Sequence, residues 1–250
     1  MKRNTVLLTG ASGKLGQAIV RSKYFSNLLT PSHQEGDITQ PKTIENFLYQ
    51  YPIECVIHCA AISKVIECQA HPSKAIEVNS IGTRHLVHAI MEKEIQDLKK
   101  IRFIHISTDG VYSGTHGNYS EQSPAIPLTH YGRTKLGAES SVRRLSNYCI
   151  IRTSFFDPAF IPFHTSPTDQ FSSKMPIQDL VHAIAFLSQH SFRGILNVGE
   201  SRKSNYEHYK PFKPSLQPCS LQEIQKECST ILMPDASMDC TLWNHIQGRG

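Results

Sequence analysis

Gly10-Ala11-Ser12-Gly13-Lys14-Leu15-Gly16 is the stretch of sequence that decides the fold. It follows a short apolar, β-rich run, Thr5–Thr9, and it leads into Leu15–Val20, whose apolar residues have helical spacing. A glycine-rich turn between a strand and a helix can bring backbone N–H groups against a pyrophosphate. The stretch therefore predicts a nucleotide-binding fold that begins at the first strand.

A second motif further along the chain is the Tyr-x-x-x-Lys pair formed by Tyr131 and Lys135. Residues four apart share one face of a helix, so the phenol and the ammonium would point into the same space. A nearby cation lowers the pKa of a tyrosine from about 10, which suits proton transfer in alcohol–ketone chemistry. The pair alone is common on helix surfaces, but with the glycine turn it indicates hydride transfer with a nicotinamide cofactor.

The size and charge of the chain limit the classes of protein to which it can belong. Its 250 residues predict one compact domain with a modest appendage. The net charge of +5 comes without a long basic run or an aromatic–basic repeat, so we expect no nucleic-acid partner. No apolar run approaches about 18 residues, and Met1–Asn4 leaves no room for a signal peptide before the first strand. We expect no membrane partner and a cytoplasmic location.

Cysteines and histidines raise the question of disulfides and metals. The 7 cysteines are scattered without paired spacing, which favours reduced, buried thiols. The 13 histidines include no His-Glu-x-x-His. His85, His88 and Glu92 share a helix face, which we interpret as a solvated face, so no metal site is expected.

Predicted strands and helices alternate through the first two-thirds of the chain. Besides the first strand and helix, the expected strands are 27–30, 54–59, 102–107, 149–152 and 195–198, and the expected helices are 41–51, 72–91, 127–145 and 179–189. This order predicts an α/β fold with a parallel sheet between two helical layers. Residues 155–176 show no clear periodicity, 201–218 are expected to form a loop, and Ser220–Glu223 is a capping box that opens a short helix.

Together these motifs resemble the extended short-chain dehydrogenase/reductase family, and within it the sugar-nucleotide-binding, dTDP-4-dehydrorhamnose reductase-like type. The matching stretches are Gly10–Gly16, Gly36–Ile38, His58–Ala61, Val78–Thr83, Ser107–Asp109, Tyr131–Lys135, Arg152–Ser154 and Pro234–Asp239. The resemblance implies a Rossmann-type doubly wound parallel sheet with a small, shortened C-terminal substrate region. It divides the chain into a dinucleotide-binding domain, 1–153, and a reduced substrate-binding region, 154–250, interleaved with the last strands and helices.

The resemblance also implies a set of cofactor-binding residues: Gly10, Ser12, Gly13, Lys14, Leu15, Gly16, Ser32, His33, Asp37, Ile38, Cys59, Ala60, Ala61, Tyr131 and Lys135. The three glycines would cradle the pyrophosphate and Asp37 would sit by the adenine. No acidic residue occupies the end of the second strand, where NAD-preferring sites bind the ribose 2′-hydroxyl. Ser32, His33 and Lys14 could accept a 2′-phosphate there, which favours NADP over NAD.

Thr108, Tyr131 and Lys135 are the implied catalytic residues. Tyr131 would be the general acid, Lys135 would lower its pKa and hold the nicotinamide ribose, and Thr108 would hydrogen-bond the substrate oxygen. The implied substrate-binding residues are Val65, Thr108, Asp109 and Phe155. Asn79 is either structural or orders a water molecule.

The expected function is an NAD(P)H-dependent reductase of a nucleotide-linked 4-keto-6-deoxy sugar. Gly110 replaces both the glutamate of the family's 4,6-dehydratases and the tyrosine usual in its rhamnose-type reductases. The segment between Ser154 and Asp179 is shorter than in that family. Two alternatives stay open: another sugar-nucleotide epimerase or reductase of this fold, and a non-catalytic NADP-binding regulatory protein. A homodimer packed through the Tyr–Lys helix is also implied.

Overall fold

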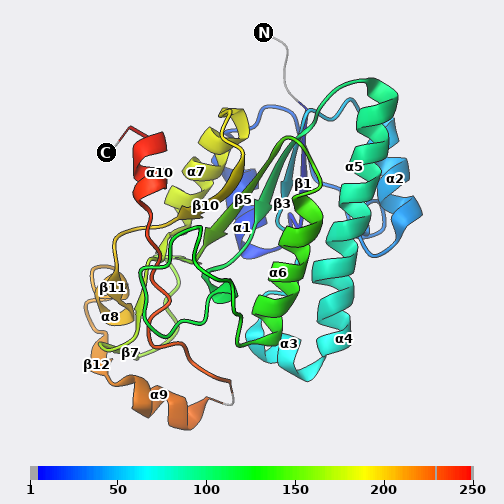
Figure 1. Cartoon of the computed structure of the whole chain (residues 1–250). Helices are drawn as coiled ribbons and strands as arrows, with labels where there is room; N and C mark the ends of the chain where they lie inside the picture. Colours follow the sequence, from blue (N-terminus) through cyan, green and yellow to red (C-terminus); the bar gives the residue numbers. More distant parts are fainter. Residues whose placement is uncertain (1–4, 229, 249–250) are drawn as a thin grey trace.

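The structure, a computed structural model, describes residues 5–228 and 230–248. Its centre is a parallel sheet in the strand order β10-β5-β4-β3-β1-β2 (Figure 1). The strands are β1 (Val6–Thr9), β2 (Leu28–Leu29), β3 (Cys55–His58), β4 (Arg102–Ile106), β5 (Tyr148–Thr153) and β10 (Gly194–Val198). The predicted doubly wound α/β fold is confirmed. The expectation for Met1–Asn4 lies outside the described residues.

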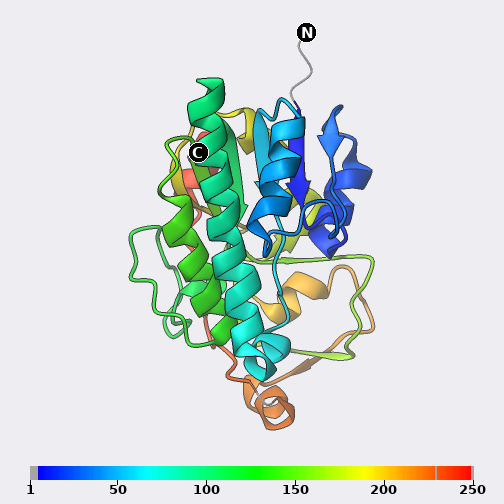
Figure 2. The ribbon, with the colours of Figure 1, turned by 90° about the vertical axis from the view of Figure 1, so that its right-hand side faces the viewer.

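Helices cover both faces of this sheet (Figure 2). One face carries α2 (Pro41–Gln50), α5 (Thr83–Asp97) and α6 (His130–Val142), and the other carries α1 (Lys14–Ser22) and α7 (Ile177–Gln189). Successive strand residues point to opposite faces, so Leu7 packs into one core and Leu8 into the other. Burial on both faces explains why these strands are continuous apolar runs.

The connection from β3 to β4 differs from the prediction. Instead of one or two helices over 72–91, the chain forms α3 (Val65–Ala70), α4 (Pro72–Ala75), a π-helix (Ile76–Gly82) and then α5. α3 was missed, because a helix of 6 residues depends on tertiary contacts more than on its own sequence pattern. The predicted helix 127–145 is shorter as well, since Thr129 caps α6 by accepting a hydrogen bond from Gly132 N at 3.1 Å.

The C-terminal part is built from small paired strands around the carboxyl edge of the sheet. Three pairs form there: β6 (Phe155–Phe156) with β9 (Met175–Pro176), β7 (Thr165–Pro167) with β12 (Gln217–Cys219), and β8 (Phe171–Ser172) with β11 (Lys203–Ser204). The helices are α8 (Asn205–Tyr209), α9 (Leu221–Glu227) and α10 (Thr241–Ile246). The capping box at Ser220 is confirmed. The expected loop 201–218 is wrong, since it contains β11 and α8.

The remaining sequence predictions concern thiols, metals and membranes. Cys55, Cys68, Cys149 and Cys240 are buried and free, as predicted, whereas Cys59, Cys219 and Cys228 are only partly buried. His88 and Glu92 are both more than half exposed, in line with a solvated face, whereas His85 is partly buried, with its Nδ1 3.2 Å from Ile38 O. In the described ranges no group of three or more His, Cys, Asp or Glu residues is placed to hold a metal ion. None of the helices described here is long and apolar enough to cross a membrane.

Candidate active site

The glycine turn connects β1 to α1 at the point where the strand order reverses. Gly10 has φ +74°, and a Cβ there would lie 2.5 Å from Ala60 N, so the end of β3 packs directly on the turn. A Cβ on Gly16 would lie 2.2 Å from Gly10 O. Two β-strands and a helix therefore meet at a spacing that only glycine permits, at the position where nucleotides bind in sheets of this kind.

The N-terminus of α1 fits an anion. Gly13, its N-cap, provides no side-chain cap, and the first turn has no acidic residue. Uncapped N–H groups and the helix dipole together attract a phosphate. Of the predicted cofactor residues here, Ser12 uses its carbonyl to accept Gln17 Nε2 at 2.8 Å, and Leu15 buries its side chain in the core. Only the backbone of Leu15 is left for a cofactor.

The residues expected near the adenine and its ribose lie in the loop between β2 and α2, and several of them pair with one another. Ser32 N donates to Glu35 Oε2 at 2.9 Å. Asp37 Oδ1 accepts from both the N–H and the hydroxyl of Thr39, each at 2.8 Å, while its Oδ2 lies 3.3 Å from His33 Nδ1. Ile38 is buried against the π-helix at Gly82. Lys14, the third residue expected at a 2′-phosphate, lies 5.3 Å from the ring of Phe160.

His58, at the end of β3, connects the last residue of β1 to the first residue of α5. Its Nδ1 lies 2.6 Å from Thr9 Oγ1, and its Nε2 lies 2.8 Å from Thr83 Oγ1. Because Thr83 donates its hydroxyl proton to Asn79 O, His58 Nε2 must be the donor and Nδ1 the acceptor. Burial lowers the pKa of His58 to about 3, so the ring is neutral. Beyond it, burial raises the pKa of Cys59 to about 12, which makes this residue an inert thiol.

Thr108, Asp109 and Tyr131 are brought together at the carboxyl end of β4. Thr108 Oγ1 accepts from Gly110 N and donates to Asp109 Oδ1, both at 3.1 Å. Burial and the Asp109 carboxylate hold the pKa of Tyr131 above its ordinary value, and the Thr108 hydroxyl partly offsets this. Tyr131 therefore carries its proton at neutral pH, as a general acid must.

Lys135 lies one helical turn after Tyr131 and is buried. Burial lowers its pKa to about 8, against the opposing effect of Cys59 and Glu139. The predicted lowering of the Tyr131 pKa by Lys135 is wrong for this structure. Burial of the phenol and the charge of Asp109 raise the pKa of Tyr131 instead.

Sequence reasoning missed the buried ion pair that supports this helix. Arg152 on β5 donates from Nε and Nη2 to the Glu139 carboxylate, at 3.0 and 2.7 Å, and Ser107 Oγ donates to Glu139 Oε1 at 2.6 Å. Arg152 Nη1 also contacts the hydroxyl of Tyr112 at 2.9 Å. An arginine inside an apolar strand was the available signal, because a buried charge requires a partner.

Asn79, for which two roles were open, is structural in this arrangement. Its amide accepts from Ile62 N at 2.7 Å, and donates to Ile62 O at 3.0 Å and to Thr134 Oγ1 at 2.9 Å. Thr134 in turn donates to Tyr131 O at 2.8 Å. The asparagine thus ties the loop after β3 to the start of α6, and these bonds use both donors and an acceptor of its side chain.

The predicted substrate residues outside this group lie on two sides of it. Val65, on α3, lines a cavity of about 230 Å³ next to His130 and Arg133, which flank Tyr131 on α6. Phe155, on β6, is paired with Met175 and packs against the core. Sequence reasoning missed Lys174, which donates to the hydroxyl of Tyr209 at 2.8 Å and acts on the ionisation of Asp109. The residues next to Lys174 in the sequence form no motif that would have indicated its place in the site.

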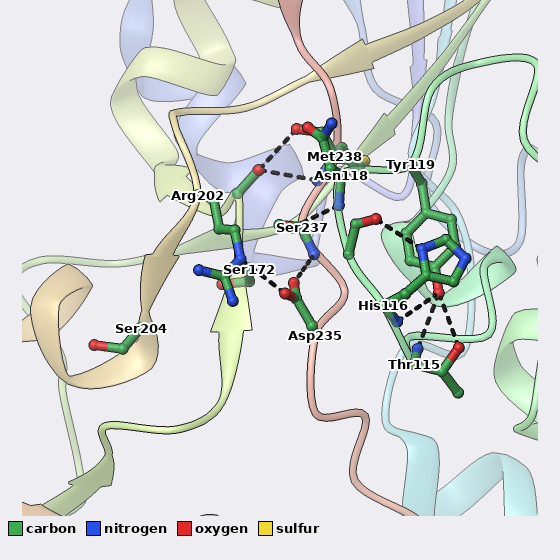
Figure 3. A network of polar contacts seen from close by, with 12 residues as sticks. Thr115, His116, Asn118, Tyr119, Ser172, Arg202, Ser204, Asp235, Ser237 and Met238 are labelled. Carbon is green, nitrogen blue, oxygen red and sulfur yellow. Dashed lines mark hydrogen bonds and ion pairs between the residues drawn. The ribbon is translucent and has the colours of Figure 1, made fainter.

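The C-terminal segment 233–239 fastens the loops around this edge of the sheet (Figure 3). Asp235 accepts from Arg202 Nε at 2.7 Å, and Ser237 Oγ accepts from Asn118 N at 2.9 Å. The backbones of Tyr119 and Met238 pair in an isolated bridge. Strand β8, the loop 113–121 and the turn at residue 202 are therefore joined through one segment from the far end of the sequence.

A Rossmann-type sheet with a glycine turn and a Thr–Tyr–Lys group near the carboxyl ends of its strands is the arrangement of a short-chain dehydrogenase/reductase fold. Residues 4–157 match the family model described as the RmlD substrate binding domain. The chain belongs to this family, and the resemblance to extended short-chain dehydrogenases/reductases is confirmed.

Individual relatives agree with this assignment. The chain is 36% identical over 163 residues to a probable low-salt glycan biosynthesis reductase of Haloferax volcanii, covering 59% of this chain and 52% of that protein. It is 30% identical over 154 residues to the dTDP-4-keto-6-deoxy-D-glucose reductase of Streptomyces niveus, covering 60% of this chain and 51% of that protein. The chain thus spans about half the length of these curated relatives.

A solved structure shows that the likeness in fold extends further. The dTDP-4-dehydrorhamnose reductase of Bacillus anthracis, in complex with NADP, superposes with a TM-score of 0.83 at 22% identity. The match covers 99% of this chain and 93% of that chain, so the small C-terminal strands have counterparts there. The predicted shortening after Ser154 and the boundary at residue 153 stay predictions.

Proposed function

We propose that this protein is an NAD(P)H-dependent reductase of a nucleotide-linked 4-keto-6-deoxy sugar. The observation that carries the proposal is the group formed by Thr108, Asp109 and protonated Tyr131, with buried Lys135 one turn away. It lies at the same edge of the sheet as the glycine turn and the uncapped α1. Relatives named as reductases of such sugars support the substrate class.

Each residue has a defined task in this proposal. Gly10, Gly13 and Gly16 would hold the pyrophosphate of a nicotinamide cofactor, which supplies a hydride when bound. Tyr131 donates its proton to the oxygen of the sugar as the ketone becomes an alcohol. The Thr108 hydroxyl stabilises negative charge on that oxygen, and the Lys135 ammonium would hold the ribose of the nicotinamide.

The test is the loss of NADPH absorbance when dTDP-4-keto-6-deoxy-hexose is added to the protein. Turnover should fall by at least about 10²-fold in Tyr131→Phe, since general acid catalysis contributes about 10²–10⁴-fold. The matched control is Tyr148→Phe, at the start of β5, which should leave the rate unchanged. Absence of turnover in the wild type, with NADPH still bound, would support the non-catalytic regulatory alternative instead.

We also propose NADP as the preferred cofactor. Lys14, Ser32 and His33 are the residues expected at the 2′-phosphate, and NADP is the cofactor in the Bacillus anthracis structure. The proposal predicts tighter binding of NADPH than of NADH, measured by fluorescence titration. Lys14→Ala should reduce this preference, because it removes a cation from the proposed 2′-phosphate site. Equal affinities for the two cofactors would contradict it.

A homodimer packed through α6, the helix of Tyr131 and Lys135, completes the proposal. Arg133, Gly137 and Ser140 of α6 are exposed and would lie in that interface. Light scattering should give twice the mass of the 28.1 kDa chain. A monomer at micromolar concentration would rule out this arrangement.

A further inference from the structure

The loop 157–164, which connects β6 to β7, carries an aromatic ring to the start of α1. In Figure 2 this segment, in yellow-green, runs out from the sheet below the blue α1. The Nζ of Lys14, the first residue of α1, lies 5.3 Å from the centre of the Phe160 ring. Lys14 directly follows Gly13, the N-cap of the helix at which the pyrophosphate is proposed to bind. A loop from the C-terminal region therefore contacts the proposed cofactor site.

The Phe160 ring is not part of the hydrophobic core. The residue is 60% exposed, and it belongs to neither of the two core clusters. Phe163, three residues later, packs against the Tyr209 ring at a centroid distance of 4.9 Å. An exposed phenylalanine contributes little to the free energy of folding, because most of its apolar surface stays in water. The contact between Phe160 and Lys14 therefore needs a reason other than burial.

The loop is held in a fixed shape on both sides of this ring. Before the ring, Phe160 N donates to Asp157 O at 3.0 Å and closes a turn. After the ring, Lys213 Nζ donates to Ile161 O at 2.9 Å and to Phe163 O at 2.6 Å. The position of the ring opposite the start of α1 is therefore set by contacts within the protein.

Lys14 can face the ring and a phosphate at the same time. An ammonium has three N–H donors, so one side of it can lie over an aromatic ring while another side donates to a phosphate oxygen. The first turn of α1 has no acidic residue that would compete for the cation. A lysine side chain loses rotamer freedom when it binds a phosphate, so a contact that already restricts it lowers the entropic cost of binding.

We propose that Phe160 is a positioning residue of the cofactor site, which holds the Lys14 ammonium against the phosphates of the bound dinucleotide and slows its release. This inference rests on the cofactor site proposed at the glycine turn. A dinucleotide that leaves must first give up its contact with Lys14, so the effect of the ring appears mainly in the dissociation rate.

The experiment measures the rate at which NADPH dissociates. Protein loaded with NADPH is mixed with an excess of NADP⁺ in a stopped-flow instrument, and the fluorescence of bound NADPH is followed. Phe160→Leu keeps an apolar side chain but removes the π face, and it should raise the dissociation rate by about two- to fivefold, as expected for an exposed cation–π contact. Phe160→Trp, which retains an aromatic face, should release NADPH no faster than wild type.

A double-mutant cycle tests whether the ring acts through Lys14. Lys14→Met removes the charge and should raise the dissociation rate by itself. Adding Phe160→Leu to Lys14→Met should have no further effect, because the contact between the two side chains is already lost. An equal effect of Phe160→Leu in the presence and in the absence of Lys14 would show that the ring does not act through the lysine, and would overturn the inference.

Phe212→Leu is the matched control. Phe212 is 47% exposed and packs on Phe156 of the same region at a centroid distance of 5.6 Å. Its substitution should leave the dissociation rate unchanged. The melting temperature of Phe160→Leu should match that of wild type, since the ring is exposed, and this agreement separates an effect on the cofactor from a loss of folding.

The outcomes distinguish the inference from the proposed function. An unchanged dissociation rate in Phe160→Leu, or an equal increase in Phe212→Leu, would overturn the inference and leave the reductase proposal intact. A wild-type protein that binds no NADPH would overturn the proposed cofactor site and this inference with it. Faster release in Phe160→Leu that depends on Lys14, with slow release retained in Phe160→Trp, is the result expected.

Discussion

The carboxylate of Glu139 and the guanidinium of Arg152 form a two-point ion pair in the interior of the protein, with both side chains at most 2% exposed. Glu139 lies one helical turn after Lys135 on α6, and Arg152 lies on β5. The pair therefore determines how the helix that carries Tyr131 sits on the sheet. Burying two charges costs desolvation free energy, which the attraction between them must offset. Removing one or both charges therefore tests how much the pair contributes to stability and to the position of α6.

Breaking this pair should be strongly destabilising. Glu139→Leu leaves the Arg152 guanidinium buried without a counter-charge, which costs about 3–5 kcal/mol of unfolding free energy. The double variant Glu139→Leu/Arg152→Met should recover most of that loss, because neither charge remains. The unfolding free energies of the single and double variants are measured by urea unfolding followed by circular dichroism. Gln178→Ala, at an exposed position of α7, is the control and should stay within about 0.5 kcal/mol of wild type.

The glycine turn allows folding and cofactor binding to be separated. Gly16→Ala places a Cβ about 2.2 Å from Gly10 O and should lower the melting temperature. Gly13→Ala meets nothing closer than 3.4 Å and has a φ of −72°, so its melting temperature should match wild type. It should nevertheless weaken NADPH binding, since its Cβ would face the pyrophosphate. Wild-type affinity in Gly13→Ala would exclude Gly13 from the cofactor site.

Acid should destabilise the fold through three buried histidines, His58, His105 and His208, whose pKa values are all lowered by burial. The unfolded chain binds their protons near pH 6.5, whereas burial lowers the pKa of His58 to about 3 and that of His105 well below its ordinary value. The unfolded state thus holds more protons in this range. Stability present above pH 6.5 is lost as the pH falls towards 3, by up to about 1.4 kcal/mol per pH unit for each histidine.

His105 offers the sharper test of this pH dependence, because neither of its ring nitrogens has a hydrogen-bond partner. His105→Phe should flatten the loss of stability between pH 6.5 and 4 without lowering stability at pH 8. His88→Phe, at an exposed position, should leave the slope unchanged. An unaltered slope in His105→Phe would mean that this ring is protonated in the folded state.

The catalytic efficiency, unlike the stability, should fall as the pH is raised. Lys135 has a pKa lowered to about 8 by burial, so its charged form disappears as the pH rises through 8. Tyr131 keeps its proton there, because its pKa lies above the ordinary value. The profile of kcat/KM should therefore fall above about pH 8, following the free enzyme's lysine. A profile that stays flat to pH 9.5 would contradict this assignment.

The order of strands and helices was predictable because a two-sided core imposes simple patterns. Buried parallel strands such as Cys55–His58 are continuous apolar runs, and α2 shows its buried face through Ile44, Phe47 and Leu48. α8 carried an overlooked signal, a capping box between Ser204 and Glu207. α3 carried none, since its N-terminus has no side-chain cap.

The candidate site was predictable where residues are neighbours in sequence and unpredictable where the fold joins distant ones. Tyr131 and Lys135 are related by one helical turn, so their common position follows from helix geometry. Arg152 and Glu139, or Lys174 and Tyr209, meet only because separate elements pack together. The ionisation of Tyr131 was mispredicted for the same reason: it depends on burial and on Asp109, neither of which the spacing of the motif reveals.

The segment 233–239 sets an order of events during synthesis. Asn118 bonds to Ser237, 119 residues later, so the loop 113–121 gains its contacts with this segment only when the final stretch of the chain leaves the ribosome. Strands β1, β3, β4 and β5 have already emerged by then and can pair. The half that carries the parallel sheet can therefore assemble while translation continues, whereas the C-terminal half closes only after it, and a ribosome stalled at residue 232 would display the first without the second.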